Sequence, residues 1–255
     1  MQNPPADEYR PSDEPPPAGC AVWPLPVDGT CPREARAHVR EALRALHVSD
    51  EMTDDACTIV SELASNAFVH ALDGVVPVAG LPELWVYRRN SRAEVVTKVF
   101  DSAPWKGTLP LGRLRPPVGS ERGRGFEIVD ALTREHGGSW GVHRTRSRLG
   151  EMPVSGKVVY FTLPVPAAEG GVGRSCRAVV RELEAALALR GLGPLHGCEG
   201  WNMAVLSVRA EITVWARRDH VVLTTPQTGI RRFSLDDVVE IAEVIVQCGE
   251  ELDAR

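Results

Sequence analysis

Four polar side chains recur every four residues within an otherwise apolar segment. They are Thr58, Glu62, Asn66 and His70. Residues four apart lie on one side of consecutive helical turns, so an acid, an amide and an imidazole would be stacked there. A carboxylate and a carboxamide one turn apart both offer oxygen ligands, which can hold a hard cation with a water or hydroxyl beside it. The alternative interpretation is a solvated helix face, where such residues are common.

A helix is needed to hold these side chains in line. From about Thr53 onward the apolar residues fall on one broad stripe, which predicts an amphipathic helix with Ser49 or Thr53 as its N-cap. Its members are Met52, Ala56, Ile59, Val60, Leu63, Ala64, Ala67 and Ala71. An edge strand is expected before it at 21–27, where two prolines exclude a central strand. A helix is expected at 32–46, because Pro32 suits a first turn and a 3.6-residue apolar stripe follows.

Two further motifs follow along the chain. Beta-rich runs at 84–89 and 95–100 predict an antiparallel hairpin, and Asp101 ends the second run. The segment Gly123-Arg124-Gly125 then opens another predicted helix. Glycines at a helix N-terminus let backbone N–H groups and the helix dipole meet phosphate oxygens. A carboxylate just past a strand is also a common turn former, so Asp101 alone keeps two interpretations.

The last two strands of this part are expected at 140–143 and 157–163. The loop predicted between them contains Arg144, Arg146 and Arg148. Surface charge is the simplest interpretation of these three arginines.

The order of these motifs resembles the ATP-binding domain of the GHKL superfamily, in the branch of bacterial anti-sigma-factor serine kinases. The resemblance covers about residues 21–166. It is carried by four segments, which are 59–71, 101–104, 121–129 and 156–161. It implies an α/β fold, a two-layer sandwich of the Bergerat type with a mixed, largely antiparallel sheet and helices on one face.

The resemblance also implies a role for each site residue. Asn66 would coordinate magnesium, and Glu62 would be the base or orienting group for the attacking hydroxyl. Asp101 would accept a hydrogen bond from the exocyclic amine of adenine. The residues that it places near the phosphates of ATP are Gly123, Arg124, Gly125 and Lys157.

The adenine loop departs from the superfamily pattern. Asp-x-Gly-x-Gly is expected, whereas this chain has Asp101-Ser102-Ala103-Pro104-Trp105. The loss of both glycines removes the easy close approach of backbone to base, and Pro104 removes a donor. The sequence leaves the effect on ATP affinity open.

Composition excludes several other classes of protein. The formal net charge of −5 over 255 residues argues against a general binder of nucleic-acid backbones. The six cysteines include no C-x-x-C pair, which predicts reduced thiols in the cytoplasm rather than a disulfide framework. His196 and Cys198 offer only two ligands, whereas structural zinc normally requires four. No apolar run approaches the about 18 residues of a membrane helix.

Competing phosphate-binding and hydrolase motifs are incomplete. Ile128 stands where a dinucleotide fingerprint requires glycine, and Gly156-Lys157 is followed by Val158 rather than Ser or Thr. No Gly-x-Ser-x-Gly elbow is present, which disfavours a serine hydrolase.

The chain is expected to divide into four parts. Residues 1–18 hold six prolines among acids and predict a disordered tail. The ATP-binding domain is expected at 19–166, and a Pro/Ala/Gly-rich linker at 167–173. The remaining residues, 174–255, predict a small α/β unit of unknown role.

Periodic stripes outline this last unit. The expected helices cover 176–187 and 235–246, and the expected strands cover 203–208, 211–216 and 220–224. The unit shows no catalytic constellation, so a docking or dimerising module is predicted. Its Trp201 and Trp215 are interpreted as core aromatics in preference to anchors for a partner.

The sequence therefore predicts a cytoplasmic regulator that binds Mg-ATP. The resemblance implies transfer of the γ-phosphoryl to a serine of an anti-anti-sigma protein, sequestration of a sigma factor, or both. No direct contact with nucleic acid or membrane is expected, and a homodimer is left open. The alternative is a non-catalytic ATP-binding switch or scaffold, favoured by the altered adenine loop and the extra unit. A two-component histidine kinase is disfavoured, because no membrane span or phosphoacceptor helix precedes the ATP domain.

Overall fold

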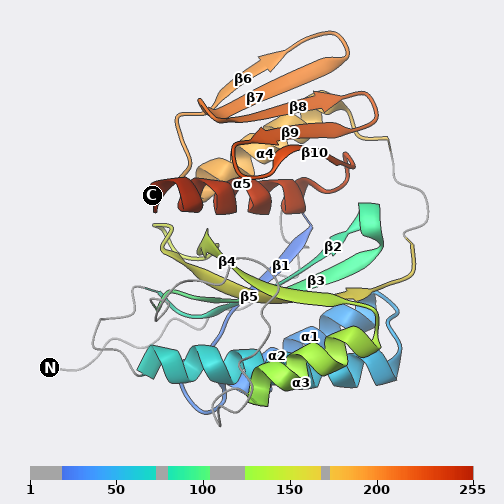
Figure 1. The fold of residues 1–255 in the computed structure, drawn as a ribbon, viewed down its shortest axis with the longest axis vertical. Coiled ribbons are helices and arrows are strands. Elements are labelled where there is room, and N and C mark those ends of the chain that lie inside the picture. Colours follow the sequence, from blue (N-terminus) through green and yellow to red (C-terminus); the bar gives the residue numbers. More distant parts are fainter. Residues whose placement is uncertain (1–18, 73–79, 104–123, 168–172, 255) are drawn as a thin grey trace, which may run out of the picture.

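The computed structural model describes residues 19–72, 80–103, 124–167 and 173–254, without the side chains of residues 70–72 and Arg124. The first unit is a five-stranded sheet with three helices (Figure 1). Its elements are β1 (Cys20–Pro24), α1 (Cys31–Ala45), α2 (Asp50–Leu72), β2 (Glu83–Arg89), a 3-10 turn η1 (Asn90–Arg92), β3 (Glu94–Asp101), α3 (Arg124–Glu135), β4 (Ser139–Arg146) and β5 (Ser155–Pro164). The tail predicted at 1–18 lies outside the described residues.

The first sheet has the order β1-β2-β3-β5-β4, and each pair of neighbours is antiparallel. Alternation along β3 gives its two faces different partners, because successive strand residues point to opposite sides. Val95 and Val99 join the core under α1, α2 and α3, whereas Val96 and Phe100 join a second cluster on the other face. The predicted α/β sandwich with helices on one face is confirmed.

The second unit is a five-stranded antiparallel meander with two helices. Its elements are α4 (Cys176–Leu189), β6 (His196–Glu199), β7 (Met203–Arg209), β8 (Ile212–Arg217), β9 (Val221–Thr225), β10 (Gly229–Phe233) and α5 (Val238–Asp253). The edge strands β6 and β10 were not predicted. All four residues of β6 are exposed, so it carries no apolar alternation that a sequence pattern could register.

The interpretation of both tryptophans as core residues is wrong. Trp201 is 93% exposed beyond the end of β6, and Trp215 is 37% exposed on β8. On β8 the inward positions are taken by Ile212, Val214 and Ala216, which leaves Trp215 on the open face of the sheet.

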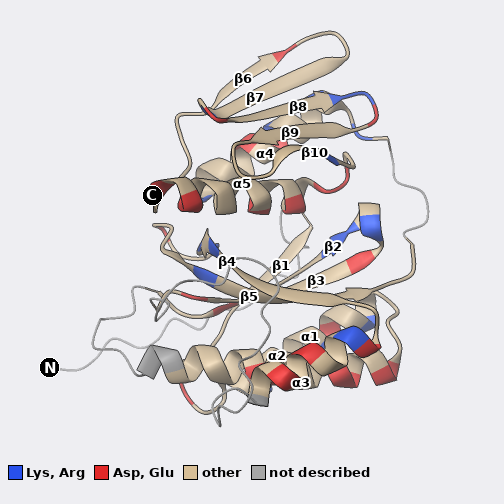
Figure 2. Cartoon of the chain, viewed as in Figure 1, with Lys and Arg blue, Asp and Glu red and all other residues tan. Residues whose placement is uncertain are grey.

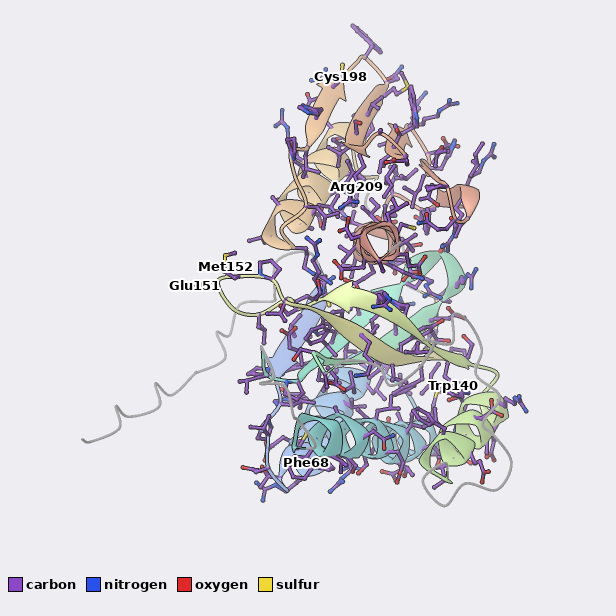
Figure 3. All side chains as sticks on the ribbon, turned by 60° about the vertical axis from the view of Figure 1, so that its left-hand side comes forward. Phe68, Trp140, Glu151, Met152, Cys198 and Arg209 are labelled. Atoms are coloured by element: carbon purple, nitrogen blue, oxygen red, sulfur yellow. The ribbon has the colours of Figure 1, made fainter. Side chains whose placement is uncertain are left out.

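Helix α5 lies between the two sheets and contacts both (Figure 1). Figure 3 views it nearly along its axis, with side chains filling the space on either side. All residues from Val238 to Glu250 except Gln247 are buried. Ile241 and Ile245 pack into the core of the second unit. Val239 packs with the face of the first sheet that is opposite α1, α2 and α3. The last helix of the second unit is therefore also the cover of the first sheet.

The side of α5 that meets the first sheet is acidic, and Figure 2 shows its red segments facing the sheet. Glu243, which is buried, accepts hydrogen bonds from three cationic side chains. Its carboxylate is 3.0 Å from Lys98 Nζ, 2.9 Å from Arg148 Nη2 and 2.6 Å from Arg190 Nη1. These cations hold the pKa of Glu243 well below its usual range, against the opposing effect of burial. The three come from β3, the β4–β5 connection and the end of α4, so one carboxylate joins both units.

Two further acids extend this contact along α5. Glu240 lies 3.0 Å from Arg89 and accepts a 2.7 Å hydrogen bond from the Tyr87 hydroxyl. Glu250 lies 2.5 Å from Nε of Arg146. The assignment of Arg146 and Arg148 to surface charge is therefore wrong, and Arg146 belongs to β4 rather than to a loop. Only Arg144 of the three is exposed.

We expect Glu243→Ala to destabilise the protein strongly. Removing one partner of a buried ion pair leaves uncompensated charge, which costs about 3–5 kcal/mol. Here Lys98, Arg148 and Arg190 lose a shared acceptor together. Urea denaturation measures the loss, with Glu211→Ala as the control because Glu211 is exposed. A loss as small as that of the control would show that the contact adds little to stability.

His143 makes the same layer sensitive to acid. Its Nε2 lies 3.2 Å from Lys98 Nζ, and burial and that ammonium lower its pKa from 6.5 to about 4. Between those values the unfolded chain binds the proton more readily, so stability falls as pH decreases from about 6.5 to 4. We expect the urea midpoint of His143→Gln to change less with pH over this interval than that of wild type. An unchanged slope in the variant would assign the acid sensitivity to other groups.

Candidate nucleotide site

Helix α2 sets the position of the predicted site residues. Ser49 precedes it and its Oγ lies 3.4 Å from the backbone N of Met52, so Ser49 is the N-cap and Thr53 lies inside the helix. The apolar stripe packs into the core, with Ile59 and Leu63 buried. Glu62 and Asn66 are half-buried at the edge of that stripe, which places them against α3 instead of in open solvent. The side chain of His70 lies outside the described residues.

The N-terminal turn of α3 comes very close to this edge. A Cβ atom at Gly125 would stand 2.8 Å from Oε2 of Glu62 and 3.8 Å from Nδ2 of Asn66. The first of these distances is shorter than a carbon and a carboxylate oxygen tolerate, so a larger residue at Gly125 would displace the Glu62 side chain. Glycine thus lets the backbone of α3 approach the acid without moving the Glu62 side chain. Gly123 and the side chain of Arg124 lie outside the described residues.

A small pocket of about 50 Å³ continues from Asn66 toward the sheet. It brings together three of the predicted residues, Asn66 from α2, Asp101 from β3 and Lys157 from β5. The rest of its wall is apolar and consists of Leu63, Ala67, Val99, Phe126 and Val159. Apolar walls with a few convergent polar groups are typical of small-molecule sites.

Asp101 and Lys157 form a buried ion pair in this pocket. They stand opposite each other in the β3–β5 ladder, and Lys157 Nζ lies 2.7 Å from Oδ2 of Asp101. The ammonium also donates to the carbonyl of Ala103 at 2.6 Å, while the backbone N of Ala103 donates to Oδ1 at 2.7 Å. Asp101 is 5% and Lys157 7% exposed. The structure thus places the Lys157 ammonium at the carboxylate expected to meet adenine.

Two aromatic rings and a histidine–aspartate hydrogen bond fix α3 against its neighbours. Phe126 stacks on Trp140 with ring centroids 5.3 Å apart, and Trp140 Nε1 donates to Asp130 at 2.9 Å. On the other side, His136 Nε2 lies 2.7 Å from Asp55 of α2. These contacts keep Gly125 at Glu62. The sequence identified Phe126 only as part of an apolar face, since stacking depends on how β4 folds back against α3.

The donors present fit a magnesium nucleotide. No group of three or more His, Cys, Asp or Glu residues able to hold a metal occurs among the described residues. Magnesium is commonly bound by one or two protein oxygens together with substrate phosphates and water, so one amide such as Asn66 beside a phosphate site suffices. The apolar walls suit a planar base, and Asp101 adds a single acceptor for its amine.

Comparison with known families agrees with this geometry. Residues 27–149 match the family model of the histidine kinase-like ATPase domain. The match supports a GHKL-like ATP-binding domain. It spans α1 to β4 and ends in the β4–β5 connection, so it includes neither Lys157 nor the second unit. A search of curated proteins gives no match for the chain.

The helices of the described part of the chain are all too short or too polar to span a bilayer.

We expect Asn66→Ala to abolish the gain in ATP affinity that magnesium provides. Its affinity for ATP in the presence of magnesium should be about tenfold or more below that of wild type. The fold should survive, because Asn66 is at the edge of the packed stripe and is not itself buried. Calorimetric ATP titrations with and without magnesium measure the effect. Thr58→Ala, two turns earlier on the same exposed edge, is the control. Equal magnesium-ATP affinities in Asn66→Ala and wild type would remove Asn66 from the metal site.

Proposed function

We propose that this protein is an ATP-dependent regulator of the anti-sigma-factor kinase type, which transfers the γ-phosphoryl of ATP to a serine of an anti-anti-sigma partner and otherwise holds a sigma factor. One observation carries the proposal: the Glu62 carboxylate and the Asn66 amide meet the glycine turn that begins α3. A base, a metal ligand and a phosphate-binding helix terminus are the parts that phosphoryl transfer requires at one place.

Glu62 has the position of a general base. Its carboxylate faces the backbone of Gly125, beside the expected phosphate position at the start of α3. In the proposed step the serine oxygen forms a bond to the γ-phosphorus, and the bond from that phosphorus to the ADP oxygen breaks. The serine proton passes to Glu62. Such a base contributes about 10²- to 10⁴-fold to rate.

Asn66 would be the protein ligand of magnesium, one turn along α2 from Glu62. A bound magnesium ion supplies neutralisation of the phosphate charge. The backbone N–H groups at the start of α3 add donors from a rigid support, because α3 is clamped through Phe126 and His136.

Lys157 is proposed as a positioning residue for Asp101. With Lys157 on Oδ2 and Ala103 N on Oδ1, the carboxylate is held in one orientation. Each carboxylate oxygen has a second lone pair, so Asp101 still has capacity to accept from the adenine amine. This arrangement assigns the Lys157 ammonium to the base end of the pocket, and leaves phosphate contacts to the α3 terminus.

A non-catalytic switch is the second candidate, and the adenine loop favours it. Ala103 and Trp105 stand where glycines would let the backbone approach the base, and Asp101 already accepts two internal hydrogen bonds. In that case nucleotide binding would alter partner docking without turnover. Formation of ADP and phosphoserine on mixing with a partner distinguishes the two candidates.

We expect Glu62→Ala to keep ATP affinity within about twofold while the transfer rate falls by about 10²-fold or more. Labelled-phosphate transfer to a candidate anti-anti-sigma protein measures the rate, and calorimetry measures the affinity. Glu127→Ala is the matched control, since Glu127 is an exposed acid in the first turn of α3. A Glu62→Ala protein as active as wild type would contradict the assignment. Absence of transfer by the wild type across tested partners would favour the switch.

A further inference from the structure

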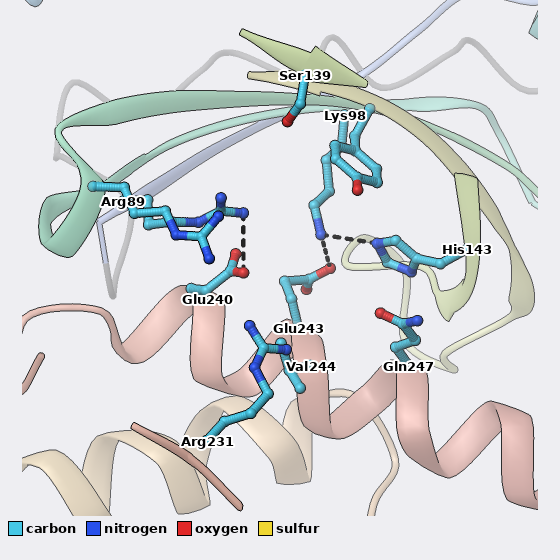
Figure 4. Close-up of a pocket in the computed structure, with 11 residues that line it drawn as sticks. Arg89, Lys98, Ser139, His143, Arg231, Glu240, Glu243, Val244 and Gln247 are labelled. Atoms are coloured by element: carbon cyan, nitrogen blue, oxygen red, sulfur yellow. Dashed lines mark hydrogen bonds and ion pairs between the residues drawn. The ribbon is translucent and has the colours of Figure 1, made fainter. Parts of the chain in front are cut away.

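A second pocket lies between the two units, on the side of the first sheet opposite the nucleotide site. It has a volume of about 190 Å³ and is lined mainly by charged side chains (Figure 4). Arg89 and Lys98 enter from β2 and β3, Glu240 and Glu243 from α5, and Arg231 from β10. The pocket is therefore built by both units.

Positive charge exceeds negative charge around this space. Four cations line it, Arg89, Arg92, Lys98 and Arg231, against two carboxylates, Glu240 and Glu243. Adding the groups paired with these side chains brings in the cations Arg148 and Arg190 and the acid Glu94, so six cations face three acids. The surplus does not depend on His143, which is neutral near pH 7 because its pKa is lowered to about 4.

Two of the four cations have no acid of their own among the described residues. Arg89 is paired with Glu94 and Glu240, and Lys98 with Glu243. The guanidinium carbon of Arg231 lies 4.8 Å from the centroid of the Phe233 ring, and neither Arg231 nor Arg92 is in an ion pair of the described part. Figure 4 shows Arg231 pointing from its strand toward the space beside Glu240. Both guanidinium groups thus have donors to spare.

We propose that this pocket binds a small oxyanion of the phosphate class, held by Arg92 and Arg231 and bridging the two units. Guanidinium groups match the oxygens of phosphate with paired donors, and a local surplus of positive charge favours a dianion. The volume of about 190 Å³ has room for an inorganic anion or the ester of a very small molecule.

The site differs from the nucleotide pocket in position and composition. Lys98 and Asp101 are on the same strand, but Lys98 points to α5 whereas Asp101 points to α2. Odd and even positions of a strand face opposite sides, so an anion bound at Lys98 is separated from ATP by the sheet itself. Binding here and binding of ATP are therefore expected together.

The test is calorimetric titration of the full chain with inorganic phosphate, at constant ionic strength and with saturating Mg-ATP present. Wild type is expected to bind, and Arg92→Gln/Arg231→Gln to bind more weakly by about a hundredfold or more, because two charged contacts are lost. Arg232→Gln is the matched control, because Arg232 is exposed and neighbours Arg231 on the opposite face of β10. It should stay within about twofold of wild type.

Thermal unfolding gives a second measurement on the same proteins. Phosphate should raise the midpoint of wild type and of Arg232→Gln, and should leave that of the double variant unchanged at equal ionic strength. Both substituted arginines are outside the buried ion network, so the double variant should remain folded. Titrations with sulfate and glycerol 3-phosphate distinguish a free oxyanion from a phosphate ester as the ligand. Tighter binding of glycerol 3-phosphate than of inorganic phosphate identifies a small phosphate ester. Equal affinities for the ester and the inorganic anions identify a free oxyanion.

Three results would overturn the proposal. They are absence of phosphate binding by wild type at millimolar concentration, equal affinity in wild type and the double variant, and displacement of phosphate by ATP. The last would place the anion in the nucleotide pocket.

Discussion

The contact between α5 and the first sheet determines how the rest of the chain is arranged. A single carboxylate, Glu243, accepts from cations that belong to three separate segments, and the aromatic ring of Trp85 lies beneath two of them. The guanidinium carbons of Arg148 and Arg190 are 5.3 and 5.0 Å from its centroid. Charges removed from water in this way are stable only as a complete set, because the loss of any member leaves the others buried without a partner. The two units are thereby fixed to each other with defined geometry.

This contact gives the first sheet two functional faces. Along β3 and β5 one set of alternate residues forms the wall of the nucleotide pocket, and the other set meets α5. Asp101 and Lys157 belong to the first set, Lys98 and Tyr160 to the second. The ends of these strands are also held closely, since a Cβ atom at Gly156 would stand 2.6 Å from the carbonyl oxygen of Asp101. Asp101, the residue proposed to meet the base, is therefore supported from the same ladder that carries the inter-unit charges.

Patterns of local period were sufficient to predict most elements and to select the candidate nucleotide residues. The four-residue recurrence of Glu62 and Asn66 is a property of one helix, and the hairpin that ends at Asp101 is continuous in sequence, so both were accessible. The strands β6 and β10 were missed because edge positions do not need apolar alternation. The partners of Arg146 and Arg148 were missed for a different reason. Their acids are about a hundred residues away on α5, and no local pattern distinguishes an arginine that will be covered by a distant helix from one in solvent.

The position of α5 also restricts how this chain can assemble. An uncovered sheet face with Trp85, Tyr87 and Phe100 would be an apolar surface suited to a second copy of the domain. Here those side chains are buried in a cluster that includes Val239 of α5. Opening this layer to admit another molecule would expose the cluster and separate Glu243 from its cations, which is far costlier than using a free surface. The covered face of the first sheet is therefore not a surface open to a second copy or a partner. Exposed apolar side chains on the second unit include Trp201, Ile230 and Leu189, which are 93%, 72% and 76% exposed.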